Sequence, residues 1–340
     1  MEHLTGLIIP TSTKEPDLVT IPLNSEILSP QIVEALQILR DTNPHLGRKL
    51  NHGITVDPAR NTDKCLAYWN RIQEIVVLHD NNDNLEESKE SKSQGQGCLK
   101  GINLGGLMVR ITDMTSFFQY LHDHDMPLQM LNLGGTDIPM NNLLLSLKHI
   151  NDSKSHSLDS LFLGGCGISS RKGVDDLIQL LELSVCSNVH KLDLRYNDLN
   201  GNDIEKMIPI LSSNDCKLQV LHLEGNSLKS DGAKAIGAIL SKTKSLKELY
   251  LGANGITAEG AIYLAEGLSK NTSLETLYLD GNMVGDQGAD AFREVLLDQT
   301  DKKCKNLKHL YVENNGIGKS SSIKLGRALN SDNVIGESMF

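Results

Sequence analysis

The side chains best suited to bind a metal lie in one short run, His122, Asp123, His124 and Asp125. A tetrahedral zinc site needs four ligands, or three and a water molecule. The neighbouring sequence offers no further ligand, so a solvated turn between a helix and a strand is the favoured interpretation. We expect no metal.

Catalytic motifs are missing elsewhere in the sequence. There is no G-x-x-x-x-G-K-[ST], no G-x-S-x-G and no H-E-x-x-H. The six cysteines are scattered and none falls in a C-x-x-C pair, which favours reduced thiols and a cytoplasmic or nuclear protein. We therefore expect neither enzymatic activity nor a cofactor.

Composition narrows the class of partner. The 340 residues are 39% apolar and 22% charged, which is typical of a soluble globular protein. Lys and Arg number 33 against 43 Asp and Glu, and a net charge of −10 disfavours a nucleic-acid binder. No apolar run approaches the ~18 residues of a membrane span. The N-terminal residues lack the basic start of a secretory signal, and we expect a monomer with no membrane partner.

A repeated phrase organises most of the chain. The pattern L-x-x-L-x-L-x-x-N-x-L/I begins at Leu99 and recurs at Leu128, Leu158, Val189, Leu218, Leu246, Leu274 and Leu307. The successive starts are 29, 30, 31, 29, 28, 28 and 33 residues apart. Self-similarity at such a period indicates a stack of supersecondary units.

This phrase resembles the leucine-rich repeat, and the long helical second half of each copy is similar to the ribonuclease-inhibitor type. The resemblance implies an α/β solenoid, or horseshoe, with a parallel inner sheet and outer helices. Helical spacing is visible in Ala233, Ile236 and Leu240. The glycine before each such alanine, as at Gly232, Gly260 and Gly288, predicts a helix packed closely on its strand.

Asparagines recur where each strand would bend into its turn. They are Asn197, Asn226, Asn254, Asn282 and Asn315. An amide there can bond backbone groups that the sheet leaves unpaired, so we assign this row a structural role. Leu107, Thr136 and Cys166 replace it in the first three copies, and we expect the first copy to be irregular.

The N-terminal part differs in composition. Six of the nine prolines precede residue 60, and SPQIVEALQIL predicts a helix with Ser29 as its N-cap. We predict a capping region at residues 1–70 and a degenerate first repeat at 71–97, with RIQEIVVL as its strand and a disordered polar insertion after it. The solenoid would occupy 98–330 and a tail 331–340. Ser88, Ser91 and Ser93 could accept phosphate, but a plain flexible loop is favoured.

Strand alternation predicts which side chains face the inner side of the sheet. One predicted column holds Asn103, Asn132, Phe162, Asp193, His222, Tyr250, Tyr278 and Tyr311, and the column two residues on ends in Arg195, Glu224, Gly252, Asp280 and Glu313. Three of the seven tyrosines thus form one row on consecutive copies.

Two interpretations of this row stay open. The rings could serve only as good neighbours in a sheet, or they could form a protein-binding face edged by carboxylates. The second predicts a partner with a basic surface. Its predicted contact residues are Phe162, Arg195, Tyr196, His222, Glu224, Glu248, Tyr250, Tyr278, Asp280, Tyr311 and Glu313.

The function predicted from the sequence is a non-enzymatic scaffold that binds another protein on its concave face. One alternative is a regulator of a small GTPase, because T-A-E-G-A-I-Y-L-A-E-G-L resembles the repeats of Ran GTPase-activating proteins and of NLR receptors. Another alternative is an inhibitor of an enzyme, by resemblance to ribonuclease inhibitors.

Overall fold

A computed structural model describes residues 30–43, 76–79, 98–105, 110–151, 157–169, 172–297 and 306–330. The chain forms two compact units, Met1–Leu158 and Asp159–Phe340. The predicted bounds of the cap, solenoid and tail are a finer division that these units do not test. The polar insertion that follows His79, the slot of Leu107, Ser29 and the tail lie outside the described residues.

The described part of the first unit combines a short sheet with three helices. Its elements are α1 (Pro30–Thr42), β1 (Val76–His79), β2 (Cys98–Asn103), α4 (Thr115–Asp123), β3 (Met130–Asn132) and α5 (Met140–Lys148). Strand β2 runs parallel to β3, whereas β1 runs antiparallel to β2 with an irregularity at Val77/Leu78. A strand therefore exists at RIQEIVVL, but its direction is opposite to that of a repeat strand.

Helix α1 was predicted from its proline start and is present, packed against α4. Ala35 and Leu39 are buried in this contact. The Asn43 side chain fastens the end of α1, because it accepts a hydrogen bond from the Thr112 N–H at 2.9 Å and donates one to the Asp113 carbonyl at 2.7 Å. Residues 30–43 thus cover one side of the helical layer of this unit.

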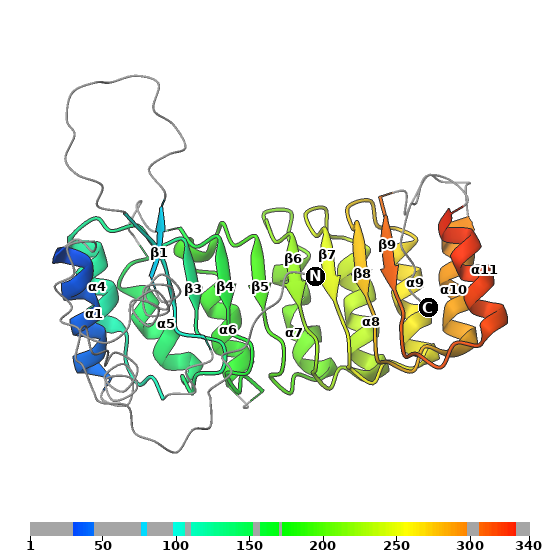
Figure 1. The fold of residues 1–340 in the computed structure, drawn as a ribbon, viewed down its shortest axis with the longest axis horizontal. Coiled ribbons are helices and arrows are strands. Elements are labelled where there is room, and N and C mark those ends of the chain that lie inside the picture. Colours follow the sequence, from blue (N-terminus) through cyan, green and yellow to red (C-terminus); the bar gives the residue numbers. More distant parts are fainter. Residues whose placement is uncertain are drawn as a thin grey trace, which may run out of the picture. The chain divides into compact units, whose positions relative to one another are not determined.

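The second unit alternates short strands with helices. Its strands are β4 (Ser160–Phe162), β5 (Lys191–Asp193), β6 (Val220–His222), β7 (Glu248–Tyr250), β8 (Thr276–Tyr278) and β9 (His309–Tyr311). Its helices are α6 (Gly173–Leu181), η1 (Ser184–Cys186, a 3-10 turn), α7 (Gly201–Leu211), α8 (Lys229–Leu240), α9 (Ala258–Leu268), α10 (Gly285–Leu297) and α11 (Lys319–Asn330). The strands are parallel and follow chain order, as Figure 1 shows.

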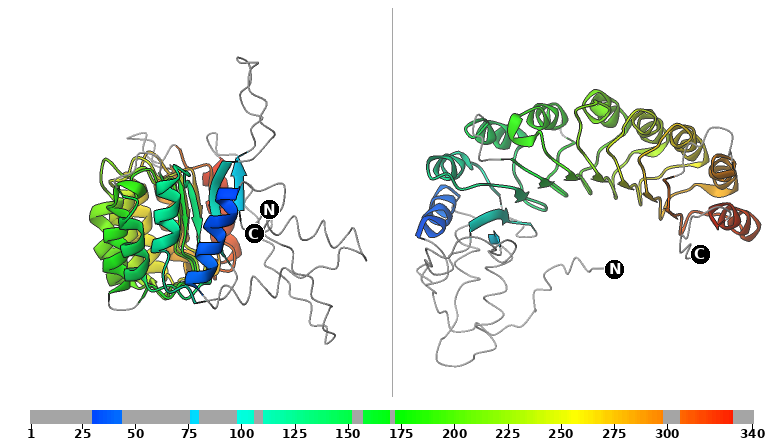
Figure 2. Two further views of the ribbon diagram at one scale, coloured as in Figure 1. Left: turned by 90° about the vertical axis from the view of Figure 1, so that its left-hand side faces the viewer. Right: turned by 90° about the horizontal axis from the view of Figure 1, so that it is seen from above.

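All helices described in the second unit lie on one face of its sheet (Figure 2). We call the opposite face the inner face. The middle leucine of each strand points toward the helices and is at most 3% exposed in β4 to β9. The predicted alternation along the strands is confirmed, since these leucines form the core and the residues flanking them lie on the inner face.

Glycines let neighbouring helices approach closely, whereas the sequence predicted that they would let each helix approach its strand. A Cβ on Gly260 would lie 2.8 Å from the Ile256 side chain and 3.0 Å from the Ala233 side chain. A Cβ on Gly288 would lie 2.7 Å from Ala261. A side chain at these places would separate each helix from the preceding helix and from its own turn.

The predicted asparagine row is buried and bonded to the backbone. Asn282 is typical: its Oδ1 accepts from the N–H groups of Asn254 and Ile256, both at 3.0 Å, and its Nδ2 donates to the carbonyls of Leu251 and Leu279. Each such amide ties one turn to the next strand. The structural role assigned to this row is therefore confirmed.

Two forms of turn follow the strands, and they differ in where the second left-handed residue lies. After β7 and β9 it comes early, at Gly255 or Gly316; after β6 and β8 it comes later, at Lys229 or Gly285. In the later form the Lys229 N–H donates to the Asn254 main-chain carbonyl at 3.0 Å. The Oδ1 of Asn254 is buried without a hydrogen-bond partner among the described residues, whereas Asn315 Oδ1, next to the other turn of the later form, accepts from the Val284 N–H at 3.3 Å.

Candidate functional site

Strand register places the predicted aromatic residues in one row on the inner face. Phe162 pairs with Asp193, which pairs with His222, and Tyr250, Tyr278 and Tyr311 continue the row. Adjacent strands of a sheet lie about 4.8 Å apart, close to the spacing of stacked rings. The repeat therefore imposes a stack wherever consecutive copies carry rings.

The rings of His222, Tyr250, Tyr278 and Tyr311 stack face to face. Their centroids are 4.1, 4.3 and 4.3 Å apart, with interplanar angles of 18°, 8° and 3°. We call these four residues the ring ladder. Because each ring covers the face of its neighbour, the three tyrosines are half-buried rather than exposed as predicted, and they offer their edges to the inner face.

Burial changes the chemistry of the phenols. Tyr250 donates from its hydroxyl to Glu248 Oε2 at 2.8 Å. Burial and this bond to a carboxylate both raise the pKa of Tyr250, and burial together with the negative charge that Tyr311 would carry raises the pKa of Tyr278. Tyr250 and Tyr278 are thus neutral hydrogen-bonding groups at physiological pH.

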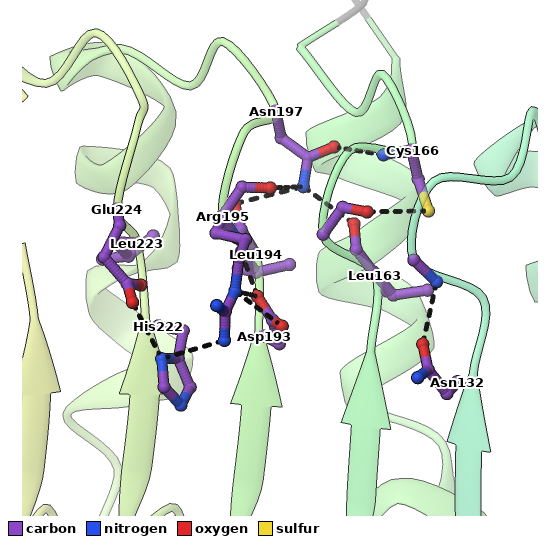
Figure 3. Close-up of polar contacts among 12 residues, drawn as sticks. Asn132, Leu163, Cys166, Asp193, Leu194, Arg195, Asn197, His222, Leu223 and Glu224 are labelled. Carbon is purple, nitrogen blue, oxygen red and sulfur yellow. Dashed lines mark hydrogen bonds and ion pairs between the residues drawn. The ribbon is translucent and has the colours of Figure 1, made fainter. Parts of the chain in front are cut away.

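A charged cluster adjoins the His222 end of the ladder (Figure 3). Arg195 Nε lies 2.9 Å from both carboxylate oxygens of Asp193, and an Arg195 terminal nitrogen lies 3.3 Å from His222 Nδ1. The same Nδ1 is 3.1 Å from Glu224 Oε1. Since Nδ1 must donate to Glu224 but accept from Arg195, only one of these two bonds forms in a given protonation state.

The Arg195 guanidinium of this cluster is paired with Asp193. Burial lowers the pKa of Arg195, but the hydrogen bonds and the charge of Asp193 outweigh burial and raise it overall. The glycine column provides the space: a Cβ on Gly164 would lie 2.8 Å from Arg195 Cγ and 3.1 Å from Asp193 Oδ1. Asp193 was not among the predicted contact residues, although its two-residue spacing from Arg195 would have revealed the pair.

Carboxylates line the rest of the inner face without cationic partners. Among the described residues no ion pair involves Glu248, Asp280 or Glu313. Asp280 Oδ1 accepts from the Glu313 N–H at 2.9 Å. Burial, and to a smaller extent the charge of Glu313, raise the pKa of Asp280, while the hydrogen bond from the Glu313 N–H lowers it; the raising causes prevail.

The remaining predicted contact residues lie at the edges of this surface. Phe162 is half-buried, with Lys191 Nζ 5.6 Å from its ring centroid. Tyr196 follows β5 and is 65% exposed. It is not part of the ring ladder, because it stands in the turn.

Other candidate chemistry is absent from the described part of the chain. His122 Nδ1 faces Asp123 and His124 Nδ1 faces the Tyr120 carbonyl, and no group of three metal-ligating side chains forms there. Cys166 and Cys186 are buried, and burial raises the pKa of Cys186 to about 12. Within these same residues, no helix has the length and apolar character needed to cross a bilayer.

Comparison with known proteins agrees with this architecture. The family described as Leucine Rich repeat matches residues 185–207, 214–237, 243–265 and 270–292, four spans that run from before β5 into α10. Residues 185–292 thus contain leucine-rich repeats. The described strands and helices of the chain form the α/β array of that fold. No curated protein sequence matches the chain.

Three solved structures are similar to this chain at low identity. Actin-binding site 2 of leiomodin-1 is 14% identical with a TM-score of 0.32, over 56% of this chain and 85% of that one. An internalin of Listeria monocytogenes is 16% identical with a TM-score of 0.40, over 71% and 61%. A leucine-rich repeat protein of Leptospira interrogans is 17% identical with a TM-score of 0.36, over 71% and 60%. The chain thus spans less than two thirds of the two bacterial proteins.

Proposed function

We propose that the inner face of the second unit binds another protein. The observation that carries this proposal is the ring ladder in register with carboxylates that have no cationic partner in the described chain. Such a face combines apolar ring edges with hydrogen-bonding hydroxyl groups and net negative charge. We propose a non-enzymatic scaffold whose partner presents a basic surface.

Two kinds of side chain would contribute to binding of the partner, tyrosines and carboxylates. Tyrosine is enriched among binding hot spots, where truncation of one anchor costs about 2 kcal/mol or more. Carboxylates at the edge of an interface mainly accelerate and orient the encounter with a basic partner. Glu248, Asp280 and Glu313 gain a counter-charge only when such a partner arrives.

Two narrower assignments belong to the same proposal. The helical second half of each copy, as in α8 and α9, supports a ribonuclease-inhibitor-like type of repeat. The scattered cysteines support residence in the cytoplasm or nucleus.

Affinity capture with matched variants tests the proposal. We expect a variant with Tyr250, Tyr278 and Tyr311 all changed to Ala to lose a partner that the natural protein retains. Tyr263→Ala is the control, since Tyr263 lies in α9, on the helical side of the sheet, where Lys234 Nζ is 5.5 Å from its ring centroid. Circular dichroism confirms that both variants fold. Equal capture by the triple variant and the control would refute the proposal.

The GTPase-regulator alternative rests on residues 257–268, whose sequence resembles Ran-type activators. Its test is the hydrolysis of GTP by a Ran-like GTPase with and without this protein. An accelerated rate would favour it, and an unchanged rate would dismiss it.

A further inference from the structure

Tyr196 has an unusual backbone for so large a side chain. Its φ is 54°, in the left-handed region, where side chains other than Gly, Asn and Asp are strained. The equivalent residues of the other described copies are Gly135, Gly165, Gly225, Ala253, Gly281 and Asn314, all with positive φ. The turn thus requires this conformation, and Tyr196 is its one large occupant among the described copies.

The ring of Tyr196 rests on a glycine of the next copy. A Cβ on Gly225 would collide with Cδ1 and Cε1 of the ring, and the Tyr196 N–H donates to the Glu224 carbonyl at 2.9 Å. The side chain nevertheless remains 65% exposed. Its hydroxyl makes no hydrogen bond within the described residues, so burial and bonding do not account for the strain.

Strain of this kind persists where function requires it. An exposed aromatic face attracts cations, and the planar guanidinium of arginine stacks on it better than the ammonium of lysine. Arg195, the neighbour of Tyr196 in the sequence, is already paired with Asp193 at 2.9 Å. Toward β9, Asp280 and Glu313 form no ion pair among the described residues, so a basic side chain of a partner would meet negative charge there.

Resting on the proposed function, we propose that Tyr196 is the anchor of the inner-face site and stacks on an arginine side chain of the bound protein. A second basic residue of that partner would meet Asp280 and Glu313. Tyr196 follows β5 and Asp280 follows β8, three strand spacings away, or ~14 Å. An extended segment that crosses the strands covers this distance in about four residues.

A peptide titration tests the arginine assignment. The probe is Gly-Arg-Gly-Gly-Gly-Arg-Gly, compared with versions that carry lysine or the neutral isostere citrulline. NMR of tyrosine-labelled protein detects weak binding, and seven tyrosines give few signals. We expect the arginine peptide to shift the Tyr196 signal at the lowest concentration and the citrulline peptide at the highest.

Two substitutions separate binding from structure. Tyr196→Gly should weaken the arginine peptide about three- to tenfold while raising the urea midpoint of unfolding, because glycine accepts left-handed backbone without strain. Tyr196→Phe should keep both properties. A lower urea midpoint for Tyr196→Gly would show that the ring is structural, and an unchanged peptide affinity would show that it is not the anchor. Either result overturns this inference.

The triple tyrosine variant keeps the two proposals distinct. Peptide binding lost in that variant but kept in Tyr196→Gly would leave the inner face as a binding site and remove Tyr196 from it. If the natural protein binds all three peptides equally, the arginine assignment is wrong, while protein capture by the inner face still decides the proposed function.

Discussion

Two rows of side chains cross the same strands of the second unit and meet opposite conditions. The asparagine row is buried, and apart from Asn254 Oδ1 its donors and acceptors are bonded to the backbone. The ring ladder is half-buried, its hydroxyls reach the inner face, and the adjoining carboxylates lack counter-charges among the described residues. One repeat therefore builds a closed row that holds the array together and an open row available for binding.

The largest expected effect concerns the closed row. Asn282→Ala would leave the N–H groups of Asn254 and Ile256 without their amide acceptor, at a cost of about 3 kcal/mol or more. The Leu279 carbonyl keeps the hydrogen bond that Asn315 Nδ2 donates. Asn254→Ala removes only donated bonds, since its Oδ1 has no partner among the described residues, and should cost about 1–2 kcal/mol. Urea unfolding of both variants measures the difference. Equal losses would show that the bonds accepted by Asn282 Oδ1 add nothing to stability.

This closed row was largely predictable from sequence, because it follows from periodicity. A leucine at the centre of each strand from β3 to β9, and an asparagine at each bend from β5 to β9, fix burial and backbone bonding in these copies. The positions of the strands and the burial of Leu249, Leu277 and Leu310 were therefore correct.

Features that depend on contacts between neighbouring copies were harder to predict from the sequence. The rings were predicted to be exposed, but stacking depends on strand spacing and on rotamers that a single copy does not encode. The strain at Tyr196 is visible only when its backbone is compared with that of Gly225. No repeated sequence pattern indicates that β1 runs antiparallel to β2.

A loss of stability of intermediate size should distinguish Tyr278, in the middle of the ring ladder, from Tyr311 at its end. Tyr278 stacks on two rings, at 4.3 Å each, whereas Tyr311 has one stacking partner on a neighbouring strand. A stacked aromatic pair contributes about 0.5–1.5 kcal/mol, so Tyr278→Ala should cost about twice as much stability as Tyr311→Ala. Thermal unfolding gives both values. A larger loss for Tyr311→Ala would mean that the ladder does not stabilise through stacking.

The smallest expected change in stability tests whether the carboxylates beside the ring ladder carry charge that no cation neutralises. Burial and then Glu313 raise the pKa of Asp280 above 3.8, so the folded chain binds this proton more tightly than the unfolded chain. The stability that Asp280 contributes is therefore complete below its unfolded pKa and is lost as pH rises through its folded pKa. Asp280→Asn keeps an oxygen for the Glu313 N–H and should be more stable than the natural protein at pH 7, by less than about 1 kcal/mol.

Urea unfolding at pH 7 and at pH 3 checks this last prediction, because the advantage of Asp280→Asn should vanish once the natural carboxyl is protonated. Glu313→Gln is the matched variant, since it removes the repelling charge and leaves Asp280 in place. It should give part of the same gain at pH 7. A loss of stability in both variants at pH 7 would mean that these carboxylates stabilise the fold, and the open row would then resemble the asparagine row rather than contrast with it.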